Sequence, residues 1–251
     1  MEGGELAGRT ALVTGASRGI GKATVLRLTE AGARVWALAR SGDALAALER
    51  EATQEAARDP RAESGSVESM ICDVRDDAAV WLALDDLVER VGAPPDIVVN
   101  SAGVFGIARL PEETVNAFDA HLAVNLRAPF LVLRALLPGM LERGSGIVVN
   151  IGSVAGRKAF PGNAAYSASK FGLRGLHEVL VEELSGTGVR ATLVEPSATD
   201  TKLWDRLDPD EDPDLPSRHE MLEAAQVADA VHFAVTRPPG VLVPKLRLER
   251  G

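Results

Sequence analysis

Short apolar runs alternate with longer segments of helical periodicity along most of the chain. The runs are apolar throughout rather than alternating with polar residues, which is typical of strands covered on both faces. Strands that alternate with helices favour βαβ units and a parallel sheet between two layers of helices. We expect strands at 10–14, 34–39, 66–72, 96–99, 146–151, 189–194 and 241–248, and helices at 20–31, 43–58, 77–91, 111–141, 163–183 and 224–235.

This pattern predicts the α/β fold class, as a Rossmann-type, doubly wound parallel sheet of about seven strands with helices on both faces. A chain of 251 residues is long enough for one large α/β domain or for two small ones. The pattern shows no internal repeat and no interdomain linker, so we expect one domain over residues 1–251. The polar stretch 58–69, which contains Pro60 and Gly65, is expected to be a surface loop.

The composition of the chain disfavours several classes of function but does not identify one. Hydrophobic residues make up 46% of the chain and the net charge is -9, which disfavours nucleic acid and anionic membranes as partners. The chain shows neither a secretory signal nor an apolar run long enough to cross a bilayer. The single cysteine, Cys72, excludes an internal disulfide framework and favours a cytoplasmic location, and the four histidines are too scattered to predict a metal site.

A glycine-rich turn, Thr14-Gly-Ala-Ser-Arg-Gly-Ile-Gly21, lies between the first predicted strand and the first predicted helix. Glycines let the backbone turn tightly and approach a ligand closely. The helix that follows presents free N–H groups and a partial positive charge, which suit a pyrophosphate. A turn that merely joins two elements is the alternative, but the strand–turn–helix context favours a dinucleotide site. The contacts predicted here are Gly15, Ser17, Arg18, Gly19, Ile20 and Gly21.

The end of the second predicted strand bears on which dinucleotide is bound. NAD-binding Rossmann units usually place an acidic residue about twenty residues further on, where it holds the ribose hydroxyls. Here Ala39 occupies that place and Arg40 follows. Arg40 and Arg18 would attract a 2′-phosphate, which a carboxylate would repel. We therefore expect NADP(H) to be preferred over NAD(H); the alternative for Arg40 is a solvated residue at the start of the second helix.

Tyr166, the only tyrosine in the chain, precedes Lys170 by one helical turn within the segment 163–183. Residues four apart on a helix lie on one face, so the phenol and the ammonium can point into the same space. A nearby cation favours the phenolate and lowers the pKa of the phenol towards the working pH of a general acid or base. The spacing alone also fits two residues on a solvated helix, so it acquires meaning only beside the glycine turn.

With both motifs, the chain resembles the short-chain dehydrogenase/reductase family over nearly its whole length. Asp73 and Val74 match the family's adenine-contacting pair after the third strand. Asn100-Ser-Ala-Gly103 matches the Asn-Asn-Ala-Gly motif after the fourth strand, with Ser101 in place of the second asparagine. The resemblance implies further cofactor contacts at Asp73, Val74, Asn100, Ala102, Gly103, Tyr166, Lys170, Pro196 and Thr201.

The resemblance also implies a catalytic set, Asn125, Ser153, Tyr166 and Lys170, and hydride transfer between a nicotinamide and a carbonyl or alcohol. Tyr166 would exchange a proton with the substrate oxygen, Ser153 would hydrogen-bond that oxygen, and Lys170 would lower the Tyr166 pKa and hold the nicotinamide ribose. Asn125 would anchor a water beside Lys170. The alternatives are a helix-interior amide bonded to nearby backbone for Asn125 and a hydroxyl that satisfies its own loop for Ser153.

Two departures from the family pattern limit what the resemblance implies. Ser197 follows Pro196, where the family usually has glycine, so the backbone there is expected to approach the nicotinamide differently. The C-terminus lacks the glycine-rich tail that helps many relatives form tetramers, and Pro244 suits an edge strand. We expect a homodimer or a homotetramer; the departure at the C-terminus weakens the case for a tetramer and leaves a dimer through the long helices.

Substrate choice is less constrained by the sequence. We expect the pocket to be lined by Val104, Phe105, Val154, Ala155, Phe160 and the loop 196–207, which suits a small-molecule carbonyl or alcohol with apolar groups. The acidic stretch 205–216 is predicted to be a mobile loop, either solvated or a lid that disfavours anionic substrates. The competing functions are an NADP(H)-sensing regulator without turnover, and an epimerase or dehydratase. The catalytic set disfavours the first, and the turn spacing and the short C-terminal region disfavour the second.

Overall fold

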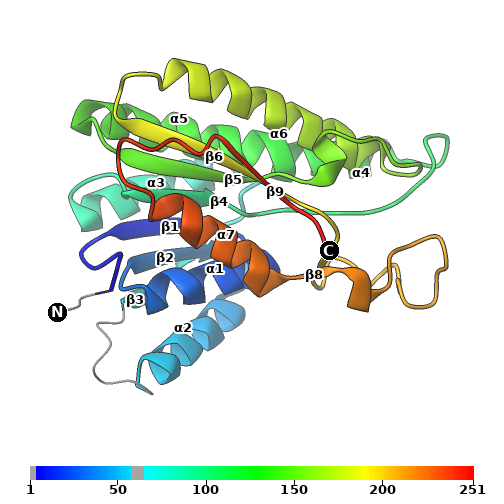
Figure 1. Ribbon diagram of the computed structural model, residues 1–251, viewed down its shortest axis with the longest axis horizontal. Coiled ribbons are helices and arrows are strands. Elements are labelled where there is room, and N and C mark those ends of the chain that lie inside the picture. Colours follow the sequence, from blue (N-terminus) through cyan, green and yellow to red (C-terminus); the bar gives the residue numbers. More distant parts are fainter. Residues whose placement is uncertain (1–3, 58–64) are drawn as a thin grey trace.

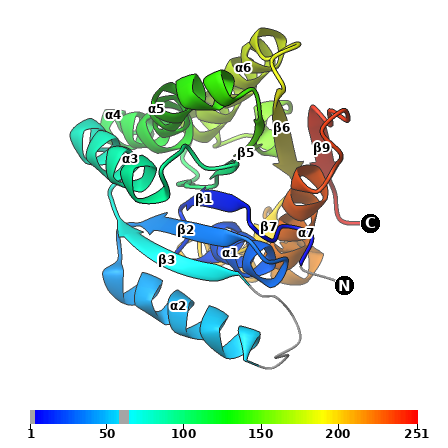
Figure 2. The ribbon, with the colours of Figure 1, turned by 90° about the vertical axis from the view of Figure 1, so that its left-hand side faces the viewer.

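The computed structural model of the protein describes residues 4–57 and 65–251. Among these residues, a seven-stranded sheet has the order β3-β2-β1-β4-β5-β6-β9, and every neighbouring pair is parallel (Figure 2). The strands are β1 (Thr10–Thr14), β2 (Arg34–Ala39), β3 (Ser66–Ile71), β4 (Ile97–Asn100), β5 (Gly146–Ile151), β6 (Val189–Pro196) and β9 (Lys245–Leu248). The predicted fold class is confirmed.

Helices cover both faces of this sheet (Figure 1). One apolar core lies under α1, α2 and α7, and a second lies under α3, α5 and α6. The buried strands are apolar on both faces because each face meets a helical layer. The helices are α1 (Gly19–Glu30), α2 (Gly42–Ala56), α3 (Asp77–Val91), α4 (Val115–Leu122), α5 (Ala128–Arg143), α6 (Ala164–Glu183) and α7 (Ala224–Val235).

Most predicted elements are confirmed to within a few residues, and two require correction. The long helical region expected at 111–141 consists of α4, a π-helical segment Ala123–Arg127, and α5. The last strand begins at Lys245, four residues later than expected, because Pro244 has no N–H to donate to a ladder. The loop expected at 58–69 lies mostly outside the described residues, and β3 occupies its last part.

A second, two-stranded parallel sheet was not expected from the sequence. It pairs β7 (Thr199–Asp200) with β8 (Leu222–Glu223). Strands of two residues are too short to show a hydrophobic period, and only the closeness of two distant segments creates them. This small sheet closes the base of the excursion 201–221, which projects from the body of the molecule beside the carboxyl ends of the main strands (Figure 1).

The strand order places the candidate residues along one edge of the main sheet. The chain runs outward from β1 to β3 and then crosses back to pair β4 with β1, so the order reverses between these two strands. In open α/β sheets, ligands bind at such a switch point, outside the carboxyl ends of the strands. The glycine turn follows β1, Arg40 follows β2, Asp73 follows β3, and Ser153 follows β5.

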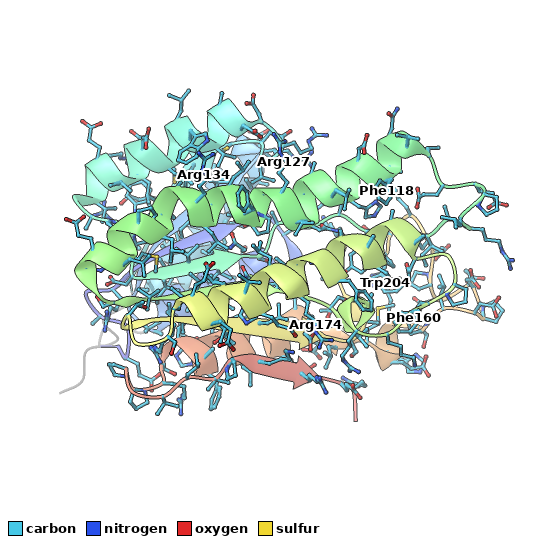
Figure 3. All side chains as sticks on the ribbon, turned by 90° about the horizontal axis from the view of Figure 1, so that it is seen from above. Phe118, Arg127, Arg134, Phe160, Arg174 and Trp204 are labelled. Atoms are coloured by element: carbon cyan, nitrogen blue, oxygen red, sulfur yellow. The ribbon has the colours of Figure 1, made fainter. Side chains whose placement is uncertain are left out.

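The continuous helical rod Val115–Arg143 bears on the expectation that no apolar run is long enough to cross a bilayer. By length and composition it could cross a membrane, although no apolar run of that length was expected. Half of its most apolar window is buried inside the protein. The rod packs on the sheet between α3 and α6, so its apolar residues serve the core of the domain (Figure 3).

Candidate active site

The glycine turn is packed directly against the turn that follows β4. Gly15 has φ 68°, and a Cβ at this position would lie 2.6 Å from Ala102 Cα. Thr14 Oγ1 accepts hydrogen bonds from the backbone N–H groups of Ser101 at 3.1 Å and Ala102 at 3.2 Å. A side chain at Gly15 would therefore push the two turns apart. This close backbone contact explains the residue types better than a simple connecting turn would.

The remaining glycines of the turn also face backbone or the excursion 201–221. A Cβ at Gly21 would lie 2.3 Å from the carbonyl oxygen of Gly15, and one at Gly19 would lie 3.2 Å from Thr201 Cγ2. Gly19 has φ 55°, a conformation that glycine adopts without strain. The turn thus lacks a side chain at the three positions where backbone or the excursion comes close, and it forms a cradle at the N-terminus of α1 that fits the dinucleotide phosphates expected there.

Charged groups gather at the other end of the expected dinucleotide site. Arg18 and Arg40 are exposed and form no ion pair among the described residues. The Asp73 carboxylate accepts hydrogen bonds from the guanidinium of Arg75, with the shortest at 2.6 Å. Arg75, and to a smaller extent Arg40, lower the pKa of Asp73. The structure therefore places Arg40 near Asp73 and adds Arg75, which the sequence patterns did not single out.

A cavity of about 1130 Å³ opens between the carboxyl ends of the strands and the excursion 201–221. Many of the predicted residues converge on its wall, and so do several that were predicted to line a substrate pocket. From the predicted catalytic and cofactor sets, the wall includes Ile20, Gly103, Ser153, Tyr166, Lys170, Pro196 and Thr201. From the predicted substrate set, it includes Val104, Phe105, Val154, Ala155 and Phe160.

Ser153 and Tyr166 are brought together in this cavity from the end of β5 and the start of α6. Ser153 is buried, and its Oγ accepts a hydrogen bond from Ala155 N at 3.1 Å, which holds the hydroxyl in place. Burial raises the pKa of the Tyr166 phenol, and a hydrogen bond with Ser153 acts in the opposite direction. The structure thus supports the alternative role of Ser153 in its own loop as well as its contact with Tyr166.

Lys170 lies beneath Tyr166 rather than against its hydroxyl. Its Nζ donates to the carbonyl oxygen of Ile151 at 2.8 Å and lies 5.8 Å from the centroid of the Tyr166 ring. Burial lowers the pKa of Lys170 to about 8. Burial of the phenol is the largest cause of the shift in the Tyr166 pKa, and Lys170 is not among its causes, so the effect of Lys170 on that pKa stays a prediction.

Asn125 lies in the π-helical segment between α4 and α5 and is completely buried. Its Oδ1 accepts from Val104 N at 2.9 Å, and its Nδ2 donates to Val104 O at 3.0 Å and to Ser169 Oγ at 3.0 Å. The amide therefore fixes the loop after β4 against the first turns of α6. This is the alternative given above for Asn125, an amide bonded to nearby backbone, and single-turn π-helices are frequent at functional sites.

Aromatic contacts that the sequence did not reveal complete the wall. The Phe105 ring packs edge-on against Tyr166, with centroids 4.8 Å apart, and its other side meets Trp204 at 4.8 Å. Trp204 comes from the excursion 201–221, and it lies with Phe160 near the start of α6 (Figure 3). No periodic signal marks these contacts, because Phe105, Phe160 and Trp204 come from three separate loops that meet at the start of α6.

Polar groups at the rim of the cavity also come from unexpected places. The C-terminal residues Glu249 and Arg250 line it, and Glu249 pairs with Arg157. Ser197 N donates to Leu248 O at 2.8 Å, so the residue that replaces glycine after Pro196 continues the bonding between β6 and β9. No group of three metal-ligating side chains was found among residues 4–57 and 65–251.

The comparisons with known proteins agree with this geometry. A family model described as short chain dehydrogenase matches residues 9–212. The chain belongs to the short-chain dehydrogenase family. It is 39% identical over 236 residues to a 2-(R)-hydroxypropyl-CoM dehydrogenase from Xanthobacter autotrophicus, and the alignment covers 90% of each chain. It is 37% identical over 206 residues to a 2-dehydro-3-deoxy-L-rhamnonate dehydrogenase (NAD(+)) from Sphingomonas sp., covering 81% of this chain and 77% of the relative.

Among solved structures, a metagenomic short-chain oxidoreductase in complex with NADP is similar over 97% of both chains, with a TM-score of 0.81 and 34% identity. The protein is therefore a member of a family of oxidoreductases with a Rossmann-like domain. Its relatives include proteins named for NAD(+) and structures that hold NADP.

Proposed function

We propose that the protein is an NADP(H)-dependent oxidoreductase that interconverts a carbonyl and an alcohol by hydride transfer. The observation that carries the proposal is the convergence of Ser153, Tyr166 and Lys170 on one cavity beside the glycine cradle. A protein that only senses a dinucleotide would need the cradle but not a buried phenol, hydroxyl and amine around an adjoining cavity. The buried phenol, hydroxyl and amine therefore favour the enzyme over the sensor.

The protein's own groups have distinct tasks in this proposal. The bound nicotinamide supplies or accepts the hydride. Tyr166 donates a proton to the substrate oxygen in the reductive direction and accepts one in the oxidative direction. Ser153 hydrogen-bonds the same oxygen and fixes its position beside the phenol. Lys170 holds the ribose hydroxyls of the nicotinamide end, and its buried amine remains available to exchange a proton near neutral pH because its pKa is about 8.

The preference for NADP(H) over NAD(H) rests on the charges near the adenine end. Arg40 and Arg18 are exposed cations on neighbouring turns, and no carboxylate occupies the place of Ala39. Asp73, a carboxylate that Arg40 influences, is paired with Arg75 and so presents little negative charge to a 2′-phosphate. The NADP complex of the similar metagenomic oxidoreductase is consistent with this choice, and the NAD(+)-dependent relative makes it a point to test.

The proposed substrate is a small carbonyl or alcohol with apolar groups next to the reacting carbon. The lining of the cavity includes Phe105, Trp204, Val154 and Phe160, which offer apolar and aromatic surface. The segment 205–216 also contributes to the wall, as expected of a lid. The named relatives act on hydroxylated or oxo compounds, so this chemistry is within the range of the family.

We further propose that the protein acts in the cytoplasm as a homodimer through α5 and α6. Phe130 on α5 and Phe171 on α6 are each nearly half exposed, and Val179 on α6 is 57% exposed. Such side chains, gathered on the outer helical layer, favour burial against a second copy. Light scattering of the wild type and of Phe171→Glu would test the assembly, and an unchanged mass for the variant would argue against this interface.

The decisive experiment follows the oxidation of NADPH, with NADH in parallel, over a panel of aldehydes, ketones and diketones. We expect turnover with NADPH that falls by about a thousandfold in Tyr166→Phe, while the NADPH affinity is retained. Glu182→Gln, at an exposed position on the same helix and outside the cavity, is the control. Near-normal kcat in Tyr166→Phe would refute the catalytic assignment, and binding of NADPH without turnover of any substrate would favour the sensor.

A further inference from the structure

The excursion 201–221 is unusually acidic, yet its residues are tied together by one cation. The stretch 200–218 contains seven carboxylates and three basic residues. Arg218 pairs with Asp200 and, at 2.8 Å, with Asp205. Its backbone N–H donates to Asp210 Oδ1 at 2.8 Å, and its Nε lies 3.9 Å from the other oxygen of that carboxylate. Three carboxylates from separate turns thus meet at one guanidinium.

The paired carboxylates stand on either side of residues that face the site. Asp200 immediately precedes Thr201, whose methyl group lies against Gly19 of the cradle. Asp205 immediately follows Trp204, which packs on Phe105 and through it on Tyr166. The backbone N–H of Trp204 also donates to the carbonyl oxygen of Thr201 at 3.1 Å, so the two residues belong to one turn. Fixing Asp200 and Asp205 therefore fixes the turn that carries Thr201 and Trp204.

The excursion 201–221 is held by more contacts than its acidic, proline-rich composition suggests. Pro209 is buried, and Ser217 and Glu220 form a capping box around the residues that follow. The β7–β8 pair closes the base of the excursion. Among the described residues of the excursion, Arg218 is the basic side chain that pairs with these three carboxylates, and its charge offsets their mutual repulsion. Without it, three like charges would remain close together and would favour separation of the turns.

We propose that Arg218 is a positioning residue that holds Trp204 against Phe105 and so sets the wall of the cavity opposite the reacting groups. Its side chain is 30% exposed and the three carboxylates are about half exposed, so isolated pairs of this kind would contribute little. A single fork-shaped guanidinium that bridges three carboxylates is a network, and its removal adds repulsion to the loss of attraction. Only the expected effect of Arg218 on substrate kinetics rests on the proposed function. The position of Trp204 can be measured in the absence of any substrate.

The first test uses the fluorescence of Trp204 and its quenching by acrylamide. Trp36 is fully buried and inaccessible to the quencher, so a Trp81→Phe background leaves Trp204 as the responsive indole. In that background we expect Arg218→Gln to raise the quenching constant by about twofold, because the released turn exposes the indole. The matched control is Arg206→Gln, an equal change of charge in the same excursion at a residue that neither lines the cavity nor forms an ion pair among the described residues. Equal quenching constants in the two variants would overturn the inference.

Two further arms separate an electrostatic clamp from a general loss of structure. Salt at about 1 M should raise quenching in the Trp81→Phe protein and cause no further rise once Arg218→Gln is present. Replacing Asp200, Asp205 and Asp210 by asparagine in the Arg218→Gln protein should restore part of the protection, because the repulsion is gone. Quenching that is insensitive to salt and unrescued by the asparagine variants would contradict the proposal even if Arg218→Gln unfolded.

The kinetic arm connects the clamp to the substrate wall. We expect Arg218→Gln to raise KM for a bulky apolar ketone by about tenfold while kcat changes by less than about twofold, since the reacting groups are untouched. Arg206→Gln should leave both parameters unchanged. An equal fall of kcat for small and bulky substrates would contradict a role in positioning Trp204. If the wild type shows no turnover at all, the proposed function fails while the quenching arms still decide the role of Arg218.

Discussion

The two walls of the candidate site are built in different ways. The cofactor wall is made of backbone, with the glycine turn after β1 pressed against the turn after β4 and both pinned by Thr14 Oγ1. The substrate wall is made of side chains from separate loops, with Phe105 between Tyr166 and Trp204 and the excursion held by Arg218. The first wall requires glycines, which have no side chains, whereas the second requires contacts between pairs of side chains.

This difference predicts different tolerances to change. A Cβ added at Gly15 or Gly21 would meet main-chain atoms. The turns that follow two strands would therefore have to move to make room for it. A side-chain wall can change its residues and reshape the cavity while the sheet stays intact. The family can therefore share a cofactor site while its members act on different substrates, and the named relatives indeed differ in what they act on.

The largest expected effect is that of Gly15→Ala. The new Cβ would lie 2.6 Å from Ala102 Cα at φ 68°, so steric overlap and backbone strain combine. We expect a loss of about 3 kcal/mol in the free energy of unfolding, together with loss of NADPH binding. Gly8→Ala is the matched control, because Gly8 has φ 75° but no atom within 4 Å of the new Cβ. Urea unfolding of both variants checks this, and equal losses would show that strain alone matters.

Lys170, between the two walls, links activity to stability. Its pKa falls from 10.5 in the unfolded chain to about 8 in the folded protein. Between these values the unfolded chain binds the extra proton, so the contribution of Lys170 to stability improves as pH rises from about 8 to 10.5, and below about 8 its burial costs about 3 kcal/mol.

We expect Lys170→Met to remove turnover and to stabilise the protein at pH 7 by about 2 kcal/mol, after the loss of the hydrogen bond to Ile151 O is counted. The advantage over the wild type should disappear by pH 10.5, as measured by urea unfolding across that range. A constant difference between wild type and Lys170→Met would refute the assigned pKa.

Trp204→Ala tests the substrate wall by itself. Removing the indole takes away the surface that packs on Phe105, so KM for an apolar substrate should rise by about tenfold while the NADPH affinity stays the same. Trp81→Ala, on α3 and away from the cavity, is the control. If the NADPH affinity fell as well, the two walls would not be independent, which would contradict the distinction drawn between them.

The smallest expected effect concerns the charge at the adenine end. Arg40→Ala should weaken NADPH binding by about fivefold and leave NADH binding unchanged, because only the 2′-phosphate meets this exposed cation. The control is Arg50→Ala on α2, which alters the net charge equally. Fluorescence titration with each nucleotide measures both affinities. Equal effects on NADPH and NADH would place Arg40 outside the phosphate site.

Much of the fold and part of the site could be predicted from the chain alone. The bounds of β1, β2, α3, β5 and α7 agree with the apolar pattern, because strands buried on both faces and helices buried on one face each impose a local pattern that the sequence displays. The glycine turn and the Tyr166–Lys170 spacing were visible for the same reason, since each is defined by neighbours along one turn or one helix face. The convergence of Ser153, Tyr166 and Lys170 in one cavity agrees with these local patterns.

Local patterns determined the sheet, the cradle and many of the residues that face the cavity, whereas tertiary structure added the others and decided how all of them behave. Burial raised the pKa of Tyr166 where a neighbouring cation was expected to lower it, and the Asn125 amide met the backbone of Val104, which is twenty-one residues away along the chain. Arg218 acquired its role only because Asp200, Asp205 and Asp210 fold back around it. Solvent exposure and contacts between distant segments set pKa values and ion pairs, and neither has a period along the chain.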